Sequence, residues 1–164
     1  VQFAEDLHDF MEQHEIEKAN ILGFSDGGNI ALTFALKYPN KIKKLILNGA
    51  NLFPAGMKLK VRLAMERVYR MTSYEMDKSK EAKTKHDLYG LMVNEPNIQP
   101  KQLQNLNIRT LVIAGTNDII KESHSILIYE NLPNAELVFV QGEHSIANEK
   151  YEEFNTRVGE FLRN

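Results

Sequence analysis

The chain contains no cysteine, which excludes disulfide bonds, zinc sites with cysteine ligands and catalysis by a thiol. It also lacks an apolar run of 18 residues, so no segment is expected to span a membrane. Neither sign of charge dominates, because 20 Lys/Arg stand against 22 Asp/Glu and the formal net charge is −2. This balance gives no electrostatic case for binding to nucleic acid or to an anionic membrane.

Three further features are missing. No secretory signal peptide is visible, which together with the lack of cysteine favours a cytoplasmic protein. No pair of histidines has metal-ligand spacing with a nearby carboxylate, so we expect no metal. The chain opens on Val1-Gln2-Phe3, without methionine and within a helical pattern. We therefore expect that the natural protein continues upstream of Val1.

The residues that are present indicate one globular domain, because 164 residues with 43% hydrophobic and 26% charged side chains can bury a substantial core. Short apolar runs alternate with amphipathic segments, and this alternation predicts an α/β fold with four parallel strands. Strands are expected over 19–22, 44–48, 110–115 and 136–140. Helices are expected over 3–16, 30–36, 121–131 and 147–161, the first with Phe3, Leu7, Phe10 and Met11 on its apolar stripe.

Residues 51–100 interrupt this rhythm and separate two parts of the predicted core, 1–50 and 101–164. Between Lys58 and Lys85 there are nine Lys/Arg and four Asp/Glu, and five of the six methionines lie in 51–100. We expect two or three short helices that form a cap, with the basic residues on its solvated outer face. Met65 and Met71 suit the wall of an adaptable apolar pocket, although methionines could equally hold the cap on the body.

One glycine-rich stretch, Gly23-Phe24-Ser25-Asp26-Gly27, lies between an expected strand and a buried helix. A tight strand-to-helix turn exposes its apex side chain, which is the Ser25 hydroxyl. Gly23 and Gly27 are expected beside it because a β-carbon there would clash. The Asp26 amide opens the helix and can stabilise a developing oxyanion. These glycines do not fit a Gly-x-Gly-x-x-Gly dinucleotide motif, and no phosphate-loop lysine follows.

Three polar residues follow the predicted strands in the order Ser25, Asp118, His144. Since the carboxyl ends of parallel strands meet at one edge of a sheet, we expect these side chains to lie together. A serine hydroxyl needs a base to accept its proton, and histidine suits that task near neutral pH. A carboxylate would hold the imidazole in one tautomer. Glu122 is the alternative carboxylate, whereas His124 lies within an expected helix and is not expected to act as the base.

These motifs resemble those of the α/β-hydrolase fold family, close to its bacterial esterases, lipases and proline-iminopeptidase-like members. The resemblance covers essentially the whole chain, and it implies that Ser25 is the nucleophile, Asp118 the acid and His144 the base. The family also inserts its cap between the second and third of these strands. Two departures stand out. Residue 143 is Glu rather than the Gly found in many members, and the His-Gly motif that often supplies a second oxyanion donor is absent.

The resemblance implies a serine hydrolase that cleaves a small carboxylic ester through an acyl-enzyme and needs no cofactor. Phe24, Met65 and Met71 are the residues expected to line its substrate pocket. Its sheet normally begins with strands that would precede Val1, so the 164 residues alone are expected to be poorly soluble and nearly inactive. Two alternatives stay open: a proline-iminopeptidase-type aminopeptidase and a non-catalytic small-molecule receptor. The aminopeptidase requires carboxylates that face the site, and the candidates are Glu66, Glu75, Asp77 and Glu81. The sequence leaves open the acyl group and whether the protein forms a homodimer.

Overall fold

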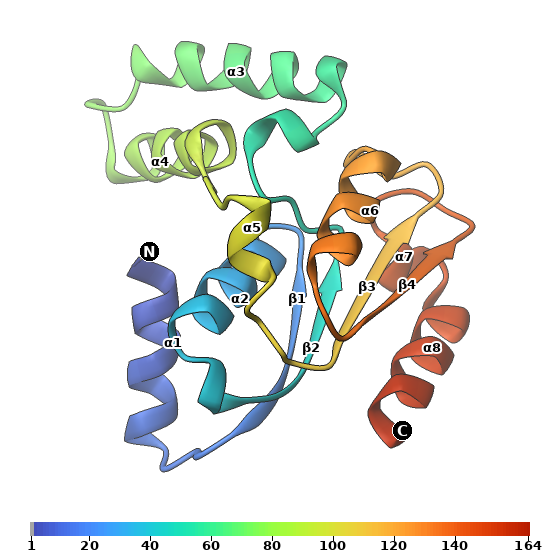
Figure 1. The fold of residues 1–164 in the computed structure, drawn as a ribbon. Helices are drawn as coiled ribbons and strands as arrows, with labels where there is room; N and C mark the ends of the chain where they lie inside the picture. The colour runs from blue at the N-terminus through green and yellow to red at the C-terminus, as the bar shows by residue number, and fades with distance from the viewer. Residues whose placement is uncertain (1) are drawn as a thin grey trace.

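A computed structural model describes residues 2–164, and its sheet has four parallel strands in the order β1-β2-β3-β4. The strands are β1 (Ala19–Phe24), β2 (Ile42–Asn48), β3 (Thr110–Gly115) and β4 (Ala135–Val140). Figure 1 shows them side by side between layers of helices. The α/β class and all four predicted strands are therefore confirmed, with β2 starting two residues earlier than expected.

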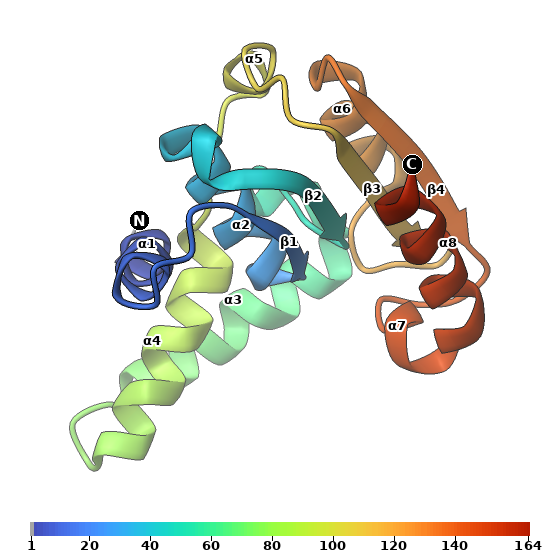
Figure 2. The same ribbon diagram turned by 90° about the horizontal axis from the view of Figure 1, so that it is seen from below.

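The helices lie on both faces of this sheet and in a projection above it (Figures 1 and 2). Their bounds are α1 (Gln2–Gln13), α2 (Asp26–Lys37), α3 (Leu59–Ser73), α4 (Lys80–Asn94), α5 (Pro100–Leu103), α6 (Glu122–Asn131), α7 (Ile146–Glu149) and α8 (Tyr151–Arg163), with short 3₁₀ turns η1 (Pro39–Lys41) and η2 (Pro54–Gly56). The single C-terminal helix expected over 147–161 is wrong, because Lys150 leaves helical geometry at φ −129° and ψ 40° and separates α7 from α8.

Two apolar clusters, one on each face of the sheet, form the core. Strand β3 contributes to both, since successive side chains of a strand point to opposite faces. Val112 packs into the cluster shared with α1, α2 and α6, whereas Leu111 and Ile113 pack against α7 and α8. Every residue of β3 is buried. Burial on both faces explains why the central strands read as nearly continuous apolar runs in the sequence.

The apolar stripe of α1 differs from the expected one. Ala4 and Met11 are buried and Leu7 is packed against the core, whereas Phe3 and Phe10 are 49% and 52% exposed. Ala4, Leu7 and Met11 also follow helical spacing, and they form the face of α1 that packs on the body. The apolar stripe expected from the sequence therefore does not coincide with the buried face of α1, because Phe3 and Phe10 lie outside that face.

Helices α3 and α4 form an antiparallel hairpin (residues 59–94) that projects from the body (Figure 2). Of its two helices, only Thr72 and His86 are buried. The His86 ring stacks on Tyr69 with centroids 4.6 Å apart, and its Nδ1 lies 3.2 Å from the Thr72 hydroxyl. The hairpin is thus held together by a small cluster of its own and contributes little to the main core.

Candidate active site

Ser25 occupies the turn between β1 and α2 in a strained backbone conformation, with φ 53° and ψ −122°. A positive φ is uncommon for a residue with a side chain, and such strain persists only where the surroundings enforce it. Part of that enforcement comes from β2, because the Ser25 amide donates to the Asn48 carbonyl at 2.8 Å. The expected strained turn is present, and Asp26 begins α2 directly after it, where its amide has no acceptor within the helix.

The clash expected for a β-carbon beside this turn is present at Gly23 and absent at Gly27. A β-carbon at Gly23 would overlap with the carbonyl of Gly27, so the first glycine is required by close approach of β1 and α2. A β-carbon at Gly27 would meet nothing within 4 Å, so the expected clash at that position is wrong. The second tight contact is at Gly28, where a β-carbon would lie 2.8 Å from the Ala50 side chain.

Ser25, His144 and Asp118 form a continuous hydrogen-bonded chain. His144 Nε2 lies 2.9 Å from the Ser25 hydroxyl oxygen, and His144 Nδ1 lies 2.7 Å from Asp118 Oδ1. Asp118 is 3% exposed, and the same Oδ1 accepts from the Ile120 amide at 2.8 Å. With a carboxylate at Nδ1, that nitrogen carries the proton and donates it, which leaves Nε2 free to accept from the serine hydroxyl.

Two glycines allow the loops after β2 and β3 to approach the loop that carries His144. Gly49 has φ 63°, and a β-carbon there would lie 2.8 Å from His144 Cε1 and 3.2 Å from Asp118 Oδ2. A β-carbon at Gly115 would overlap with the carbonyl of Glu143. The imidazole therefore packs directly against backbone on one side, and any side chain at position 49 would displace it.

The other carboxylate and histidine considered in the sequence lie on α6. Glu122 is exposed at the start of this helix, and Asp118 occupies the position beside His144. His124 is 5% exposed, and its Nε2 accepts a hydrogen bond from the Leu52 amide at 2.9 Å. Burial, assisted by the charge of Lys121, lowers the pKa of His124 to about 4. It is a neutral structural side chain that anchors the segment leading into the hairpin.

The three expected pocket residues occupy different surroundings. The Phe24 ring lies 4.9 Å from the His144 ring and is 42% exposed, so it borders the reactive group. Met65 lines an apolar crevice of about 350 Å³ between α3 and Tyr89 of α4. Met71 is 59% exposed. Neither methionine lines the larger cavity beside Asp26. The assignment of all three to a substrate pocket stays a prediction.

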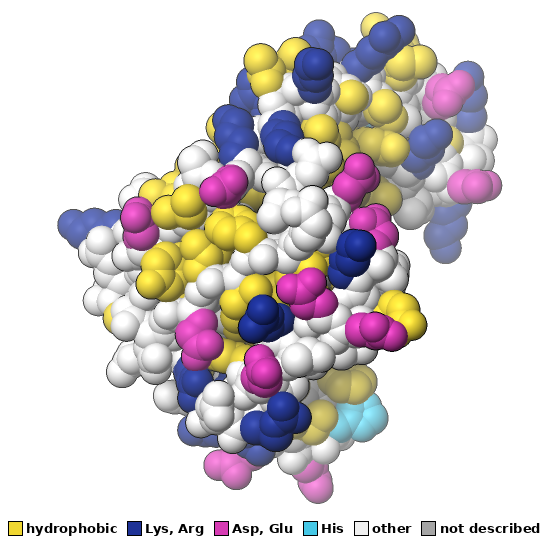
Figure 3. Space-filling view, turned by 90° about the vertical axis from the view of Figure 1, so that its right-hand side faces the viewer, with side chains coloured by type: hydrophobic (Ala, Val, Ile, Leu, Met, Phe, Trp, Pro, Cys, Tyr) yellow, Lys and Arg dark blue, Asp and Glu magenta, His cyan; other side chains and the backbone are white. Residues whose placement is uncertain are grey.

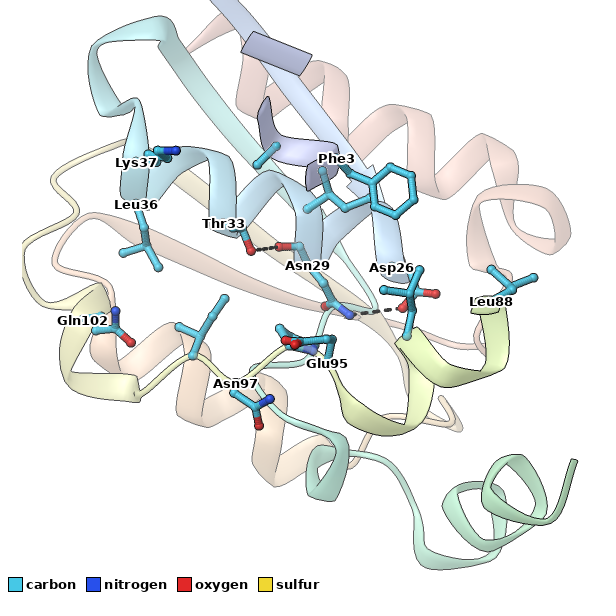
Figure 4. A pocket seen from close by; sticks show the side chains of 15 residues that line it. Phe3, Asp26, Asn29, Thr33, Leu36, Lys37, Leu88, Glu95, Asn97 and Gln102 are labelled. Carbon is cyan, nitrogen blue, oxygen red and sulfur yellow. Dashed lines mark hydrogen bonds between the residues drawn. The ribbon is translucent and has the colours of Figure 1, made fainter. Parts of the chain in front are cut away.

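A cavity of about 640 Å³ opens beside the serine turn, between α2 and the chain that leaves α4 (Figure 4). Asp26 and Thr33 line it from α2, Leu88 and Leu91 from α4, and Glu95 from the end of the hairpin. Its volume falls in the range of small-molecule sites. Burial raises the pKa of Asp26, while a hydrogen bond from Asn29 and the nearby His144 oppose that rise.

The sequence reading missed a buried pair of asparagines behind this cavity. Asn29 Nδ2 donates to Asn51 Oδ1 at 3.1 Å, and the Asn51 amide donates to Asn29 Oδ1 at 2.8 Å. Asn29 also donates to Asp26 at 3.3 Å, as Figure 4 shows. The pair joins the first turn of α2 to the segment that leads into the hairpin. Its signal in the sequence was the single amide of Asn29, directly before the apolar stretch that starts at Ile30.

Residues 2–164 contain neither a cluster of metal-ligating side chains nor a helix suited to crossing a bilayer. That part of the chain holds no group of three or more His, Asp or Glu side chains placed to bind a metal ion. None of its helices combines the length and the apolar character needed to cross a bilayer.

Comparison with known proteins shows similarity to hydrolases along nearly the whole chain. A mouse protein, serine hydrolase BPHL, is 25% identical over 180 residues, which are 98% of this chain and 60% of the mouse protein. A 2-hydroxy-6-oxononadienedioate/2-hydroxy-6-oxononatrienedioate hydrolase of Comamonas testosteroni is 28% identical over 98% of this chain and 68% of its own length. The chain therefore spans less than two thirds of the mouse relative.

Solved structures and a family model agree with these similarities. An alpha/beta hydrolase enzyme from a Medee basin deep-sea metagenome, MGS-M2, superposes with a TM-score of 0.78 at 21% identity, over 98% of this chain and 70% of that one. The meta-cleavage product hydrolase CumD of Pseudomonas fluorescens gives a TM-score of 0.73 at 22% identity, with the same coverage. The model for the alpha/beta hydrolase fold matches residues 1–93. The chain belongs to the alpha/beta hydrolase fold family.

Proposed function

We propose that the protein is a serine hydrolase that cleaves a small carboxylic ester through an acyl-enzyme. The observation that carries the proposal is the hydrogen-bonded chain from Ser25 through His144 to Asp118. These distances lie within the reach that nucleophile–base pairs need. The strained turn at Ser25 and the buried Asp118 hold the groups in place before substrate binds, so little reorganisation is needed during reaction.

The proposed reaction has two halves. Ser25 Oγ attacks the acyl carbon while its proton moves to His144 Nε2, and the ester carbonyl oxygen becomes an oxyanion. The imidazolium then gives that proton to the leaving alcohol, which departs as the C–O bond breaks and leaves the acyl group on Ser25. Water attacks the acyl-enzyme by the same proton transfers in reverse, which releases the carboxylic acid. Asp118 stabilises the imidazolium and stays ionised throughout.

The Asp26 amide is the proposed donor to the oxyanion. It is the first residue of α2, where the helix N-terminus favours negative charge. Loss of one such donor typically lowers turnover by about 10²–10³-fold. A second donor would have to come from outside this turn, and its identity is a separate question from the nucleophile.

Covalent labelling tests the nucleophile without a known substrate. The full-length protein should react with a fluorophosphonate probe and hydrolyse a generic aryl ester, and Ser25→Ala should abolish both. Ser73→Ala is the matched control, because Ser73 is exposed at the end of α3 and far along the chain from the turn. Labelling that survives in Ser25→Ala would refute the assignment. Binding of esters without turnover in the unmodified protein would favour the receptor alternative.

One observation favours the aminopeptidase as the second candidate. Two carboxylates, Asp26 and Glu95, line the 640 Å³ cavity, where they could bind a free amine. The four acids proposed from the sequence do not line it. A substrate pair that differs only by acetylation of the amine separates the candidates: a preference for the free amine that is lost in Glu95→Gln supports the aminopeptidase. Equal rates support the esterase.

The charges in the same cavity can be compared with the substrate for which one relative is named. The Comamonas hydrolase is named for a dicarboxylate substrate. Neither Ser25 nor His144 lines this cavity, and we propose that the substrate extends into it from the serine. Its two carboxylates would then repel a dicarboxylate, and Lys37 at its edge is already paired with Glu5. We therefore propose a neutral ester rather than a dienedioate. The hairpin is proposed as the cap, and Met65 and Met71 as positions that change the preference among acyl chains more than they change stability.

A further inference from the structure

The outer face of α3 carries a stripe of exposed apolar, aromatic and basic side chains. Its members follow helical steps of four, four, three and four residues, namely Leu59, Leu63, Arg67, Arg70 and Tyr74. Leu59, Leu63 and Tyr74 are 57%, 51% and 84% exposed, and the Arg70 side chain is 78% exposed. The opposite face of α3 packs on α4. The stripe therefore points away from the rest of the hairpin.

Charge is also distributed unevenly between the hairpin and the body. The hairpin (residues 59–94) contains eight Lys/Arg and five Asp/Glu, whereas the rest of the chain contains twelve and seventeen. Figure 3 shows Lys and Arg side chains among hydrophobic ones over the upper lobe. Glu66 is the one acid of α3, and it already pairs with Arg62 at 3.6 Å and Arg70 at 3.8 Å. A net charge of −2 conceals a basic projection on an acidic body.

We propose that the outer face of α3 docks the protein on an anionic lipid surface. Leu59, Leu63 and Tyr74 would enter the headgroup region, where leucine gains apolar contact and tyrosine is favoured at the interface. Arg67 and Arg70 would contact lipid phosphates and carboxylates, and each basic residue near an anionic leaflet adds to binding. The net charge of the whole chain gave no case for binding to an anionic membrane. The relevant quantity is the local charge of the surface that would contact the membrane.

The mixture of side chains identifies a lipid surface rather than nucleic acid or an acidic protein. A purely electrostatic partner has no use for three large exposed side chains interleaved with the arginines. The position of the stripe also fits a membrane. Lys58, at the start of α3, donates from Nζ to Asn117 Oδ1 at 3.1 Å, and Asn117 precedes Asp118. Docking through α3 would hold the serine site close to lipid-soluble esters, although docking itself does not depend on catalysis.

Vesicle sedimentation of the full-length protein tests the proposal. The protein should bind phosphatidylcholine vesicles that contain about 30% phosphatidylserine and should bind phosphatidylcholine alone at least about 10-fold more weakly. Binding should fall at about 0.5 M NaCl, which screens the arginines. The double variant R67E/R70E should bind at least about 10-fold more weakly, since each basic residue contributes roughly fivefold or more. L59S/L63S should also lose most of its binding.

K18E/K101E is the matched control, because it changes the net charge equally and both lysines are exposed on the body. This control should bind like the unmodified protein, and all variants should melt alike because the altered residues are exposed. Equal losses in K18E/K101E and R67E/R70E would overturn the proposal. So would unchanged binding by L59S/L63S, since that result means that the surface recognises charge alone. Failure of the unmodified protein to bind anionic vesicles would also overturn it.

Discussion

The body and the α3–α4 hairpin use their apolar residues in opposite ways. In the body, Leu45, Leu47 and Ile113 are fully buried between helices and sheet. In the hairpin, Leu59, Leu63 and Leu88 are about half exposed. The two helices of the hairpin contact each other, but this contact does not cover these leucines. The difference shows that a helical pattern alone does not reveal whether its apolar side chains form a core or a surface. What decides is whether a second layer covers them.

The largest expected effect is a difference in turnover between the loss of a carboxylate in the body and the loss of one in the hairpin. Asp118→Asn should lower turnover by about 10⁴-fold while the protein stays folded, because the amide would favour the wrong tautomer of His144. Asp87→Asn, on the exposed face of α4, should leave turnover unchanged. Kinetics on one aryl ester, with circular dichroism as the check of folding, give the result. A near-normal Asp118→Asn enzyme would exclude Asp118 as the acid.

Matched truncations of leucine should show where stability resides. Leu45→Ala removes a side chain that is 0% exposed, so the free energy of unfolding should fall by about 2–5 kcal/mol. Leu63→Ala removes one that is 51% exposed and should change it by less than about 0.5 kcal/mol. Urea titration measures both. Similar losses in the two variants would show that the stripe of α3 is covered in solution.

The dependence of stability on pH should report the anchor between body and hairpin. Because the pKa of His124 falls from 6.5 to about 4 on folding, the unfolded chain binds more protons between these values. His124 therefore stabilises the fold fully above about pH 6.5, and that contribution declines as pH drops towards 4. The loss should be on the order of 3 kcal/mol, from about 1.4 kcal/mol for each pKa unit. The glutamine of His124→Gln does not titrate. Urea titrations at several pH values should therefore show that its free energy of unfolding depends less steeply on pH than that of the unmodified protein. Equal dependence on pH in the two proteins would contradict the lowered pKa of His124.

The smallest expected effect is confined to the hairpin. The Ser79 hydroxyl accepts a hydrogen bond from the Ala82 amide at 3.0 Å and caps α4. Ser79→Ala should weaken this helix by about 1 kcal/mol. Because the hairpin contributes little to the main core, hydrogen exchange of α4 amides should accelerate while the global melting temperature stays nearly constant. A clear drop in melting temperature would mean that body and hairpin unfold as one unit.

The sequence predicted the parallel strands and the residues that follow their carboxyl ends. Strand ends place Ser25, Asp118 and His144 at one edge whatever the packing, so their meeting could be foreseen from position alone. Prediction from the sequence failed where contacts between distant segments decide which side chains are buried or paired. Both Phe3 and Phe10 fit a helical stripe, yet Ala4 and Met11 are the residues of α1 that are buried. The pair of Asn29 and Asn51 joins residues 22 positions apart, and no local pattern encodes it.

Gly115 has a consequence for protein engineering. The loop that carries Asp118 and the loop that carries His144 touch at this residue with no room for a β-carbon. The Asn117 amide also donates to the Gly142 carbonyl at 2.8 Å, which joins the same two loops a second time. Either loop transplanted alone from a homologue would meet a surface shaped for a different partner. Recombination of such hydrolases should therefore exchange these two loops together as one module.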